Sequence, residues 1–536
     1  MGRRPGSKGS VVSAQLSETR PAAPVGKALL RPHDLIRARI DGVSRSVQET
    51  TISSDTVEKR LLRRGLRPRW EGEPPSRFGR LTLDSRLVSS GDLFCAISGS
   101  RVDAHDYLAD VAAAGVGAAV VERLRPDVRL PQLRVTDTRA AGAHLASLFA
   151  DDPSASLRIA GITGTNGKTT TAWLARQLLG DLAPAAALGT LGMVGPNGER
   201  DPGALTTPDP IQLMERFAAM AAQGVERVAM EVSSHALDQR RVEALKFETV
   251  VFTSFSREHL EYHPDLAHYR SAKLRILELL EPGGVAVINA DEPAWEVVLD
   301  AGVQTLTYGL STAAEIRAVD VELGADRSSW RLVTPEGEAR VDLPMAGEFN
   351  VGNALAAAAL ALTAGMVPTR IAELLSATPA VPGRMEVLRR APSVVLRDYA
   401  HTPDAYDSVL ASLEGATSGR LFVVFGCGGD RDRGKRPLMG QAAARHADLV
   451  LVTTDNPRSE DPAAIAGDVV AGMPEGRYEI VLDRREAIAR ALELAAGDDI
   501  VVLLGKGHET YQVIGDERVP FDEAEIVREL TAGDTP

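Results

Sequence analysis

A glycine-rich segment at residues 164–170 offers the clearest chemistry in the sequence, and its letters are GTNGKTT. A short apolar run at residues 157–162 precedes it, and a helical pattern follows it as far as Leu179. In this context backbone N–H groups and a helix N-terminus can surround phosphates, Lys168 can neutralise charge, and the Thr169 hydroxyl can reach Mg²⁺. Ile162 stands where the general phosphate-loop pattern has its first glycine, so a chance match is the alternative. The flanking strand and helix favour a nucleotide site.

The composition narrows the class of protein. The chain has 536 residues and a formal net charge of -13, which argues against nucleic acid as the main partner. Cys95 and Cys427 are the only cysteines, so the sequence encodes neither a disulfide framework nor a thiolate metal cluster, and a reducing cytoplasm fits. No apolar run approaches the roughly 18 residues that span a bilayer. We predict a cytoplasmic, multidomain protein without membrane insertion.

Changes in composition and in hydrophobic pattern divide the chain into four parts. In residues 1–70 basic residues clearly outnumber acidic ones among scattered Pro, Gly and Ser, which predicts a disordered extension. Alternating strand and helix patterns then predict three α/β units, at residues 71–156, 157–382 and 383–536. Strands are predicted at residues 93–97, 157–162, 227–231, 249–253, 285–289, 394–398, 421–425, 449–453 and 500–504.

The variant phosphate loop and four later segments together resemble the Mur ligase family. The later segments are MEVSSH at 230–235, FNV at 349–351, VPGRME at 381–386 and DYAHTPD at 398–404. The resemblance runs from about residue 81 nearly to the C-terminus. It implies a three-domain α/β architecture with a central P-loop parallel-sheet domain and a Rossmann-like C-terminal domain. It also implies an ADP-forming ligase that activates a carboxylate as an acyl phosphate, which an amine then attacks.

The family resemblance assigns roles around the phosphate loop. The implied ATP-binding residues are Gly164, Thr165, Asn166, Gly167, Lys168, Thr169, Thr170, Asn350, Arg384 and His401. The implied catalytic residues are Lys168, Glu231, His259 and Lys273. The implied Mg²⁺ ligands are Thr169, Glu231 and His259, and Lys273 as its carbamate would help to hold a second Mg²⁺. Outside that context Glu231 would be a solvated carboxylate, His259 a structural histidine and Lys273 an exposed helix lysine. Residues 254–259 read SFSREH where relatives usually have NLSRDH, and we expect Ser254 and Glu258 to alter local hydrogen bonding more than activity.

The resemblance also implies the substrates. The residues implied to hold the UDP-linked muramoyl dipeptide are Leu83, Ser85, Ser100, Arg101, Val102, Thr206, Thr207, Ser233, Gln239 and Arg241. A solvated basic pair is the alternative interpretation of Arg240 and Arg241. Residues 454–458, TDNPR, resemble the specificity loop of members that add meso-diaminopimelate. The implied pocket for that amino acid is Arg431, Asp455, Asn456, Pro457, Arg458, Gly505 and Glu509.

Diaminopimelate ends its side chain in an ammonium and a carboxylate, so its pocket needs acceptors and a fork-shaped cation such as Arg458. Lysine would leave that cation unpaired, which costs a few kcal/mol. The expected reaction joins meso-diaminopimelate to UDP-N-acetylmuramoyl-L-alanyl-D-glutamate in peptidoglycan synthesis, with small-molecule substrates and a monomeric enzyme. Three alternatives remain: the same ligation with L-lysine, a folylpolyglutamate synthase-like ligase, and a P-loop ATP-binding regulator without ligase chemistry.

Overall fold

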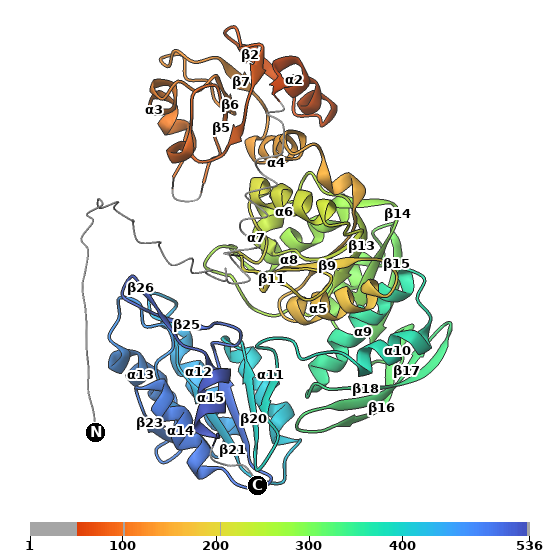
Figure 1. The fold of residues 1–536 in the computed structure, drawn as a ribbon, viewed down its shortest axis with the longest axis vertical. Coiled ribbons are helices and arrows are strands. Elements are labelled where there is room, and N and C mark those ends of the chain that lie inside the picture. Colours follow the sequence, from red (N-terminus) through yellow and green to blue (C-terminus); the bar gives the residue numbers. More distant parts are fainter. Residues whose placement is uncertain (1–50, 100–101, 204, 533–536) are drawn as a thin grey trace, which may run out of the picture. The chain divides into compact units, whose positions relative to one another are not determined.

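The computed structural model describes residues 51–99, 102–203 and 205–532 (Figure 1). Three sheets carry the architecture, of five, eleven and six strands in chain order. The strands of each sheet are mostly parallel, and helices connect many of them, as expected for an α/β protein. No helix of these residues is long and apolar enough to cross a membrane. The α/β fold class is therefore confirmed.

The first sheet has the strand order β2-β7-β6-β5-β4. Its strands and helices are β2 Arg69–Glu71, β4 Leu81–Thr82, β5 Leu93–Cys95, β6 Ala118–Val121, β7 Gln132–Arg134, α2 Ser54–Arg63, α3 Leu108–Ala113 and α4 Thr138–Phe149. Strands β4 to β7 are parallel, and β2 is antiparallel to β7. Apolar residues in all four parallel strands bury one continuous side of this sheet against α4.

The predicted extent of the disordered extension is wrong for residues 51–70. Helix α2 begins there at a Ser53 cap, and its Val57 and Leu61, four residues apart, are fully buried. Both belong to the same core cluster as Leu145 of α4. The basic charge misled the prediction because it lies on the exposed face of an amphipathic helix. Residues 1–50 lie outside the described residues.

The eleven-stranded sheet has the order β11-β10-β9-β12-β8-β13-β14-β15-β16-β17-β18. Its strands are β8 Arg158–Thr163, β9 Ala185–Gly189, β10 Gly192–Val194, β11 Arg200–Asp201, β12 Arg227–Glu231, β13 Phe247–Phe252, β14 Leu280–Asn289, β15 Gln304–Gly309, β16 Ile316–Leu323, β17 Ser328–Thr334 and β18 Gly337–Leu343. The seven strands from β9 to β16 in that order pair in parallel, and antiparallel strands extend both edges.

Helices cover both faces of this central sheet. They are α5 Lys168–Gly180, α6 Pro210–Ala222, α7 Ser234–Asp238, α8 Leu266–Leu274, α9 Glu348–Thr363 and α10 Pro368–Ser376. On β12, Val228 and Met230 share a core with Phe217 of α6, whereas Ala229 shares a core with Leu174 of α5. This alternation explains why the strand is apolar almost throughout, because both of its faces are covered. The carboxyl ends of β8, β12 and β13 consequently meet at one edge, where the phosphate loop begins.

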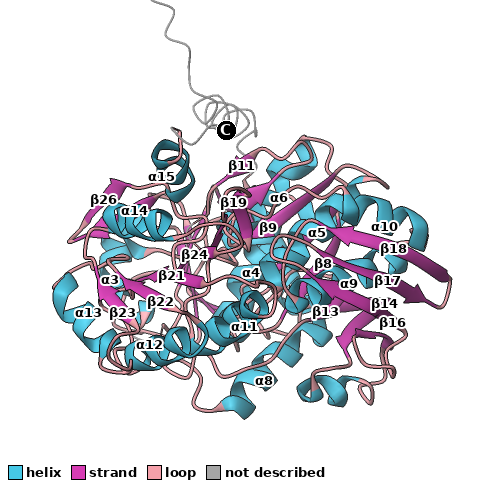
Figure 2. Ribbon diagram, turned by 90° about the horizontal axis from the view of Figure 1, so that it is seen from below, coloured by secondary structure: helices cyan, strands magenta, loops and turns pink. Residues whose placement is uncertain are grey.

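The six-stranded sheet has the order β19-β20-β24-β21-β22-β23. The elements of this third unit are β19 Glu386–Arg389, β20 Val394–Asp398, β21 Leu421–Phe425, β22 Leu449–Val452, β23 Tyr478–Ile480, β24 Ile500–Leu504, α11 Pro403–Glu414, α12 Lys435–His446, α13 Pro462–Val470, α14 Arg484–Leu494 and α15 Glu523–Leu530. A hairpin of β25 Tyr511–Ile514 and β26 Glu517–Pro520 is separate. In Figure 2, α12 and α13 lie on one side of these strands and α14 and α15 on the other.

Capped helix starts set several of these boundaries. Asp209 accepts hydrogen bonds from two backbone N–H groups at the start of α6, and Pro210 follows it. Thr402 with Pro403 begins α11, and Asp461 with Pro462 begins α13, in the same way. A side-chain acceptor at the cap satisfies a free N–H group, and proline at the next position loses nothing because its missing N–H would be unpaired.

A buried ion pair and an exposed one join the same two helices and provide a matched stability test. Arg484 contacts Glu523 at 2.7 Å with both side chains fully buried, whereas Arg485 contacts Glu529 at 2.8 Å with about half of each exposed. We expect Glu523→Gln to lower the free energy of unfolding by about 3–5 kcal/mol, because the buried guanidinium loses its counter-charge. Glu529→Gln should cost less than about 1 kcal/mol. Urea denaturation followed by circular dichroism measures both, and equal losses would contradict the expectation.

Candidate active site

The phosphate loop lies between β8 and α5. Gly164 has φ +149°, and a Cβ there would overlap the Thr253 hydroxyl, so both conformation and space require glycine. The Lys168 ammonium donates to the Gly164 carbonyl at 3.0 Å and to the Thr165 carbonyl at 2.7 Å. Burial lowers the pKa of Lys168. The side chain is thus folded over the loop that the sequence predicts to hold ATP phosphates.

The segment after β13 holds this loop in place. The Ser254 carbonyl accepts from the Thr165 N–H at 2.7 Å, and the Ser254 hydroxyl accepts from the Asn166 N–H at 3.0 Å. The Ser256 N–H in turn donates to the Thr165 hydroxyl at 3.0 Å. Ser254, which departs from the family pattern, therefore supports the loop through its own side chain.

The role of Ser254 predicts a small effect for its replacement by the residue usual in the family. An asparagine carbonyl oxygen can accept the same Asn166 N–H bond, so Ser254→Asn should change kcat by less than about fivefold. Ser254→Ala leaves that N–H without its side-chain acceptor and should weaken ATP binding by about tenfold. Steady-state kinetics at varied ATP measure both, and a many-fold gain in kcat for the asparagine variant would contradict this account.

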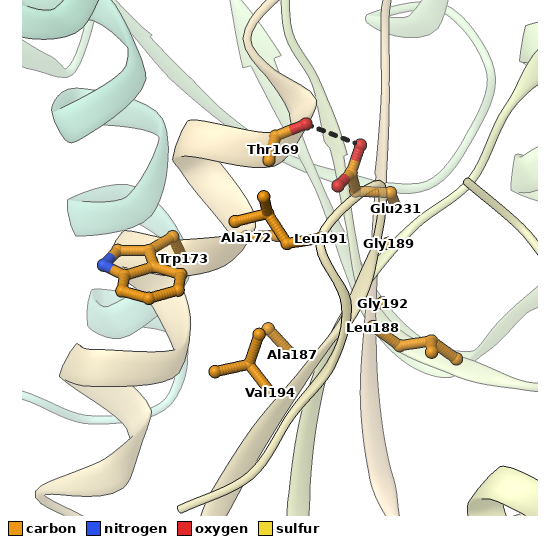
Figure 3. A pocket seen from close by; sticks show the side chains of 10 residues that line it. All are labelled: Thr169, Ala172, Trp173, Ala187, Leu188, Gly189, Leu191, Gly192, Val194 and Glu231. Atoms are coloured by element: carbon orange, nitrogen blue, oxygen red, sulfur yellow. Dashed lines mark hydrogen bonds between the residues drawn. The ribbon is translucent and has the colours of Figure 1, made fainter. Parts of the chain in front are cut away.

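Glu231 ends β12 as a buried carboxylate with 2 % exposure. It accepts hydrogen bonds from the Thr169 hydroxyl at 3.0 Å, the Thr190 N–H at 2.8 Å and the Thr190 hydroxyl at 3.1 Å. Figure 3 shows the Thr169 and Glu231 side chains pointing toward each other between α5 and the strands. Within the described part of the chain, no Lys, Arg or His side chain forms an ion pair with Glu231. The carboxylate therefore keeps its negative charge available.

These oxygen donors fit a magnesium ion. Mg²⁺ in proteins commonly uses one or two carboxylates and completes its octahedron with water and substrate phosphates. In residues 51–99, 102–203 and 205–532, no group of three or more His, Cys, Asp and Glu side chains is arranged to hold a metal by itself. The Thr169 hydroxyl and the Glu231 carboxylate beside a phosphate loop instead suit a Mg²⁺ ion that takes its other ligands from water and the nucleotide phosphates.

Lys273 of α8 contacts the same loop. Its amine donates to the Gly164 carbonyl at 2.6 Å, lies 4.5 Å from the centre of the Tyr269 ring, and is almost completely buried. Burial and the nearby Lys168 ammonium lower the pKa of Lys273 well below its ordinary value. The alternative interpretation of Lys273 as an exposed helix lysine is therefore wrong.

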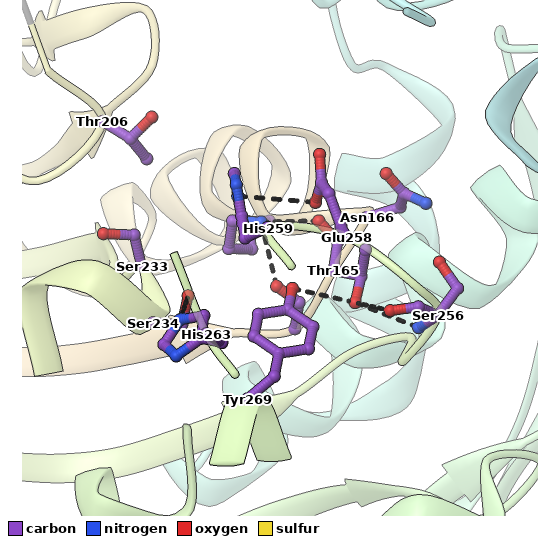
Figure 4. A network of polar contacts seen from close by, with 12 residues as sticks. Thr165, Asn166, Thr206, Ser233, Ser234, Ser256, Glu258, His259, His263 and Tyr269 are labelled. Carbon is purple, nitrogen blue, oxygen red and sulfur yellow. Dashed lines mark hydrogen bonds and ion pairs between the residues drawn. The ribbon is translucent and has the colours of Figure 1, made fainter. Parts of the chain in front are cut away.

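His259 lies among acidic and aromatic side chains rather than against Glu231. It is 3.6 Å from Glu258 and 3.4 Å from Glu261, and its ring is 4.7 Å from that of His235. Its backbone has φ +58°, which is unusual for a residue with a side chain. Figure 4 shows Glu258 and His259 beside Asn166 and Thr165 of the phosphate loop. The structure thus brings His259 to the loop, while its direct partners are the two glutamates.

The third unit contributes Arg384 and His401 to this region. The Arg384 guanidinium donates to the Thr169 hydroxyl at 3.3 Å and lies 4.5 Å from the centre of the Tyr399 ring. The half-exposed His401 ring is 4.0 Å from Glu258. Arg384 therefore reaches the phosphate loop itself, whereas His401 reaches Glu258 in the segment that follows β13.

Asn350 is positioned differently from the other predicted ATP contacts. It is 1 % exposed, its amide donates to the Ala346 carbonyl at 2.8 Å, and its oxygen accepts from Asn353 at 3.1 Å. The Asn353 oxygen comes so close to Gly167 that a Cβ there would overlap it. Asn353 was missed by the sequence analysis, although its spacing of three residues from Asn350 places both on one side of α9.

The residues predicted to grip the muramoyl dipeptide form a second group next to Glu231. The Thr207 hydroxyl donates to the Glu231 carbonyl at 2.9 Å, and the Ser233 N–H donates to that hydroxyl at 3.1 Å. Arg241 donates to the Thr207 carbonyl at 3.0 Å and to the Gln239 side-chain oxygen at 2.6 Å. These partners of Arg241 are neutral, so its charge remains available to an anion.

Two further predicted contacts can be placed relative to this group. The Thr206 hydroxyl is 3.1 Å from that of Thr190, which itself contacts Glu231. Arg240 forms ion pairs with Asp137 and Glu243. The alternative of a solvated basic pair therefore fits Arg240 better than Arg241.

The described residues of the first unit that are predicted to contact the uridine nucleotide make no contact with the phosphate loop. Ser85 begins a short 3₁₀ turn, Leu83 approaches Gly142, and Val102 is 54 % exposed. Ser100 and Arg101 lie outside the described residues. None of the contacts of these described side chains reaches the phosphate loop, which is expected if they hold a distant part of a long substrate.

The predicted amino-acid pocket gathers at the carboxyl ends of β22 and β24. The Asn456 amide donates to the Glu509 carboxylate at 2.9 Å, and the Arg458 guanidinium donates to the Gly429 carbonyl at 2.7 Å. A Cβ on Gly505 would lie 2.9 Å from the Asp455 carboxylate. No carboxylate of the described residues forms an ion pair with Arg458.

Two other predicted members line the same pocket. Arg431 is exposed on the glycine loop after β21, where a Cβ on Gly428 would lie 3.7 Å from Arg431 and 3.0 Å from Arg458. The Pro457 carbonyl comes so close to Gly429 that a Cβ there would overlap it. The loop at 428–431 and the loop at 455–458 are therefore in direct contact.

Lys506 is a member of this cluster that the sequence analysis missed. Its fully buried ammonium is 3.5 Å from Asp455, 3.3 Å from the Asn456 side-chain oxygen and 3.3 Å from Glu509. Two glycines flank this lysine directly after a buried strand, and that local pattern was a usable signal.

Comparisons with known proteins agree with this geometry. Three family models match the chain. The model of the Mur ligase middle domain matches residues 162–361, that of the Mur ligase glutamate ligase domain matches residues 383–507, and that of the Mur ligase family catalytic domain matches residues 78–150. The chain therefore belongs to the Mur ligase family, as its motifs predict. It is accordingly an ATP-dependent ligase of the amide-forming class.

Several relatives share one name, UDP-N-acetylmuramoyl-L-alanyl-D-glutamate–2,6-diaminopimelate ligase. The protein of that name from Gloeobacter violaceus is 42% identical over 475 residues, which cover 88% of this chain and 96% of that protein. The one from Alkalilimnicola ehrlichii is 43% identical over 470 residues, covering 84% and 94%. A solved structure of a ligase of that name has 35% identity and a TM-score of 0.63, covering 86% of this chain and 96% of the other.

A solved MurF ligase from Thermotoga maritima in complex with ADP shares the fold, with 19% identity and a TM-score of 0.58. It covers 85% of this chain and 97% of its own length.

Proposed function

We propose that this chain uses ATP to join meso-diaminopimelate to UDP-N-acetylmuramoyl-L-alanyl-D-glutamate in peptidoglycan synthesis. The observation that carries the proposal is the cluster of charged side chains after β22 and β24. It combines carboxylates at Asp455 and Glu509 with the Arg458 guanidinium, which has no carboxylate partner in the described chain. Such a pocket suits a side chain that ends in both an ammonium and a carboxylate.

The reaction proceeds through an acyl phosphate. The substrate carboxylate attacks the γ-phosphorus of ATP, the bond to the β-phosphate oxygen breaks, and ADP leaves with its electron pair. The amine of the amino acid then attacks the acyl carbon, and inorganic phosphate leaves from the tetrahedral intermediate while the amine loses a proton. Catalysis of such phosphoryl transfer rests mainly on positioning and charge neutralisation.

The protein residues divide this work between two groups. Lys168 and Arg384 supply positive charge at the phosphate loop, where the nucleotide phosphates would bind. Arg241 supplies a cation near Glu231 for the carboxylates of the muramoyl dipeptide. Thr169, Glu231 and His259 are the residues that would hold Mg²⁺, and carbamylated Lys273 would help to hold a second Mg²⁺; the bound ions would neutralise the phosphate oxygens.

The buried Lys273 amine suits carbamylation. An uncharged amine attacks CO₂ and releases a proton, which leaves an anionic carbamate that can serve as an oxygen ligand. Because burial lowers the pKa of Lys273, a larger share of its amine is uncharged near neutral pH than for an exposed lysine. Acidification protonates the amine and reverses the reaction.

A phosphate-release assay tests the proposed function. It measures inorganic phosphate from ATP with the precursor alone, with added meso-diaminopimelate, and with added L-lysine. We expect release that requires both precursor and meso-diaminopimelate. Preference for lysine would support the lysine-adding alternative, release with a folate and L-glutamate would support the folate ligase, and ATP binding without release would support the regulator.

A carbamylated Lys273 predicts dependence on CO₂. Lys273→Arg retains a cation but cannot form a stable carbamate under these conditions, so its kcat should fall by about 10²–10³-fold. Wild-type enzyme stripped of CO₂ in mildly acidic buffer should lose activity and regain it with bicarbonate at neutral pH. The readout is phosphate release before and after bicarbonate, and full activity of the arginine variant would overturn this role.

We further propose that the enzyme acts as a cytoplasmic monomer on small-molecule substrates. The two cysteines, Cys95 and Cys427, are free and buried, and burial raises the pKa of both thiols. Such thiols are compatible with a reducing compartment that also supplies ATP. Size-exclusion chromatography with light scattering tests the monomeric state.

A further inference from the structure

Lys506 lies on the turn after β24, with its ammonium among the polar side chains of the amino-acid pocket. We propose that Lys506 determines specificity by making this pocket electrically neutral, so that it selects a side chain ending in both an ammonium and a carboxylate over one ending in an ammonium alone. This inference rests on the proposed function and adds to it a residue that does not itself bind the acid group.

The contacts of Lys506 place its charge between the two acidic members of the pocket. Its ammonium is 3.5 Å from Asp455 and 3.3 Å from Glu509, and its side chain is 0 % exposed. A buried ammonium is costly unless carboxylates compensate for it, and two buried carboxylates side by side are costly without a cation. The three charges therefore stabilise one another as a unit.

Lys506 also fixes the orientation of Asn456. It donates to the Asn456 oxygen at 3.3 Å, and the Val513 N–H donates to the same oxygen at 2.9 Å. The Asn456 amide group then points to Glu509, to which it donates at 2.9 Å. The Asn456 oxygen is consequently engaged, which leaves the carboxylates as the acceptors for a ligand ammonium.

The charges that face the pocket balance only when Lys506 is included. Asp455 and Glu509 are opposed by Lys506 and Arg458, so two anions meet two cations. On the facing loop, the residue pair Asp430 and Arg431 adds one charge of each sign.

The neighbouring buried cations are already paired. Arg484 pairs with Glu523, and Arg436 pairs with Glu460 and Asp468. Removal of Lys506 would therefore leave the pocket with an excess negative charge while Arg458 remained to bind a ligand carboxylate.

This balance has opposite consequences for the two amino acids. The distal end of diaminopimelate carries no net charge, so a neutral pocket can pair both of its groups. The lysine side chain carries one positive charge, so it leaves Arg458 unpaired in a partly buried site. In a pocket with an excess negative charge, repulsion of the ligand carboxylate would disfavour diaminopimelate and attraction would favour lysine.

The role of Lys506 in specificity is tested by measuring kcat/KM for meso-diaminopimelate and for L-lysine, by phosphate release with saturating precursor. The specificity ratio is kcat/KM for meso-diaminopimelate divided by kcat/KM for L-lysine. Lys506→Met should lower this ratio by about tenfold or more. Lys506→Arg keeps the charge and should keep the ratio within about threefold of wild type. A purely structural role would lower both kcat/KM values together and leave the ratio unchanged.

Two variants at Glu509 keep the proposal testable if Lys506→Met folds poorly. Glu509→Gln alone gives the pocket an excess positive charge and should raise the ratio, even though both substrates lose the same ammonium contact. The double variant Lys506→Met/Glu509→Gln restores neutrality and should return the ratio toward wild type. Melting curves establish that each variant is folded.

Each result then supports or overturns the inference. A ratio that is unchanged in Lys506→Met, or that falls equally in Lys506→Arg, overturns it, as does a ratio that falls in Glu509→Gln. Wild-type enzyme that releases no phosphate with meso-diaminopimelate overturns the proposed function and this inference together. Wild-type preference for diaminopimelate combined with a charge-independent ratio overturns the inference alone.

Discussion

Replacement of Lys168 by alanine is expected to lower precursor-dependent phosphate release by about 10³-fold or more. The Lys168 ammonium lies 3.0 Å from the Gly164 carbonyl and 2.7 Å from the Thr165 carbonyl, at the turn that we propose to bind the phosphates. Phosphoryl transfer spreads negative charge over the equatorial oxygens, and a fixed cation at that point acts on the transition state more than on the ground state. Alanine removes the charge and offers no donor in its place.

The effect should appear mainly in kcat, and steady-state kinetics at varied ATP separate it from KM. Lys246→Ala is the matched control, because Lys246 belongs to the same unit and is exposed. It should leave kcat within about twofold of wild type. Equal losses in the two variants, or activity of Lys168→Ala near wild type, would show that this loop does not hold the reacting phosphates.

Replacement of Arg458 by methionine is expected to lower kcat/KM for meso-diaminopimelate by about 10³-fold, which corresponds to about 4 kcal/mol. The Arg458 guanidinium is held by the Gly429 carbonyl at 2.7 Å and has no carboxylate partner in the described chain. A substrate carboxylate would therefore be its counter-charge, and methionine has a similar length but no charge. The backbone bond from the Arg458 N–H to the Val513 carbonyl, at 3.0 Å, is independent of the side chain.

The same variant should change kcat/KM for L-lysine far less, because lysine has no distal carboxylate to lose. Arg485→Met is the matched control, since Arg485 lies in the same unit, is about half exposed and pairs with Glu529. Kinetics with both amino acids measure the effect. A parallel loss for lysine and diaminopimelate would assign Arg458 to the structure of the pocket instead of to recognition of the carboxylate.

Much of the regular structure could be predicted from local sequence. The strands predicted at residues 227–231, 394–398, 421–425 and 500–504 coincide with β12, β20, β21 and β24. These strands are buried on both faces, so short apolar runs between turn residues mark them clearly. The strand predicted at residues 249–253 begins two residues late, because Phe247 is separated from the rest of β13 by the partly exposed Glu248.

The small folded segment before residue 71 could not be predicted from charge counts. Charge summed over residues 1–70 describes a basic extension, yet two apolar residues one helical turn apart pack α2 into the core of the first unit. A sum over a long window cannot detect such a pair, because only its spacing carries the information.

The sequence by itself determined the strand, glycine-rich loop and helix around residues 157–179, several of the buried parallel strands, and the residue types of the two proposed binding sites. These features depend on neighbours in the chain, where helix caps, glycine turns and apolar periodicity act. Only the tertiary structure decided which side chains meet: Lys273 with the carbonyl of Gly164, and Lys506 with Asp455 and Glu509. Burial then lowers the pKa of Lys273 and brings the charge of Lys506 between two carboxylates, and burial depends on packing between segments that are distant in sequence.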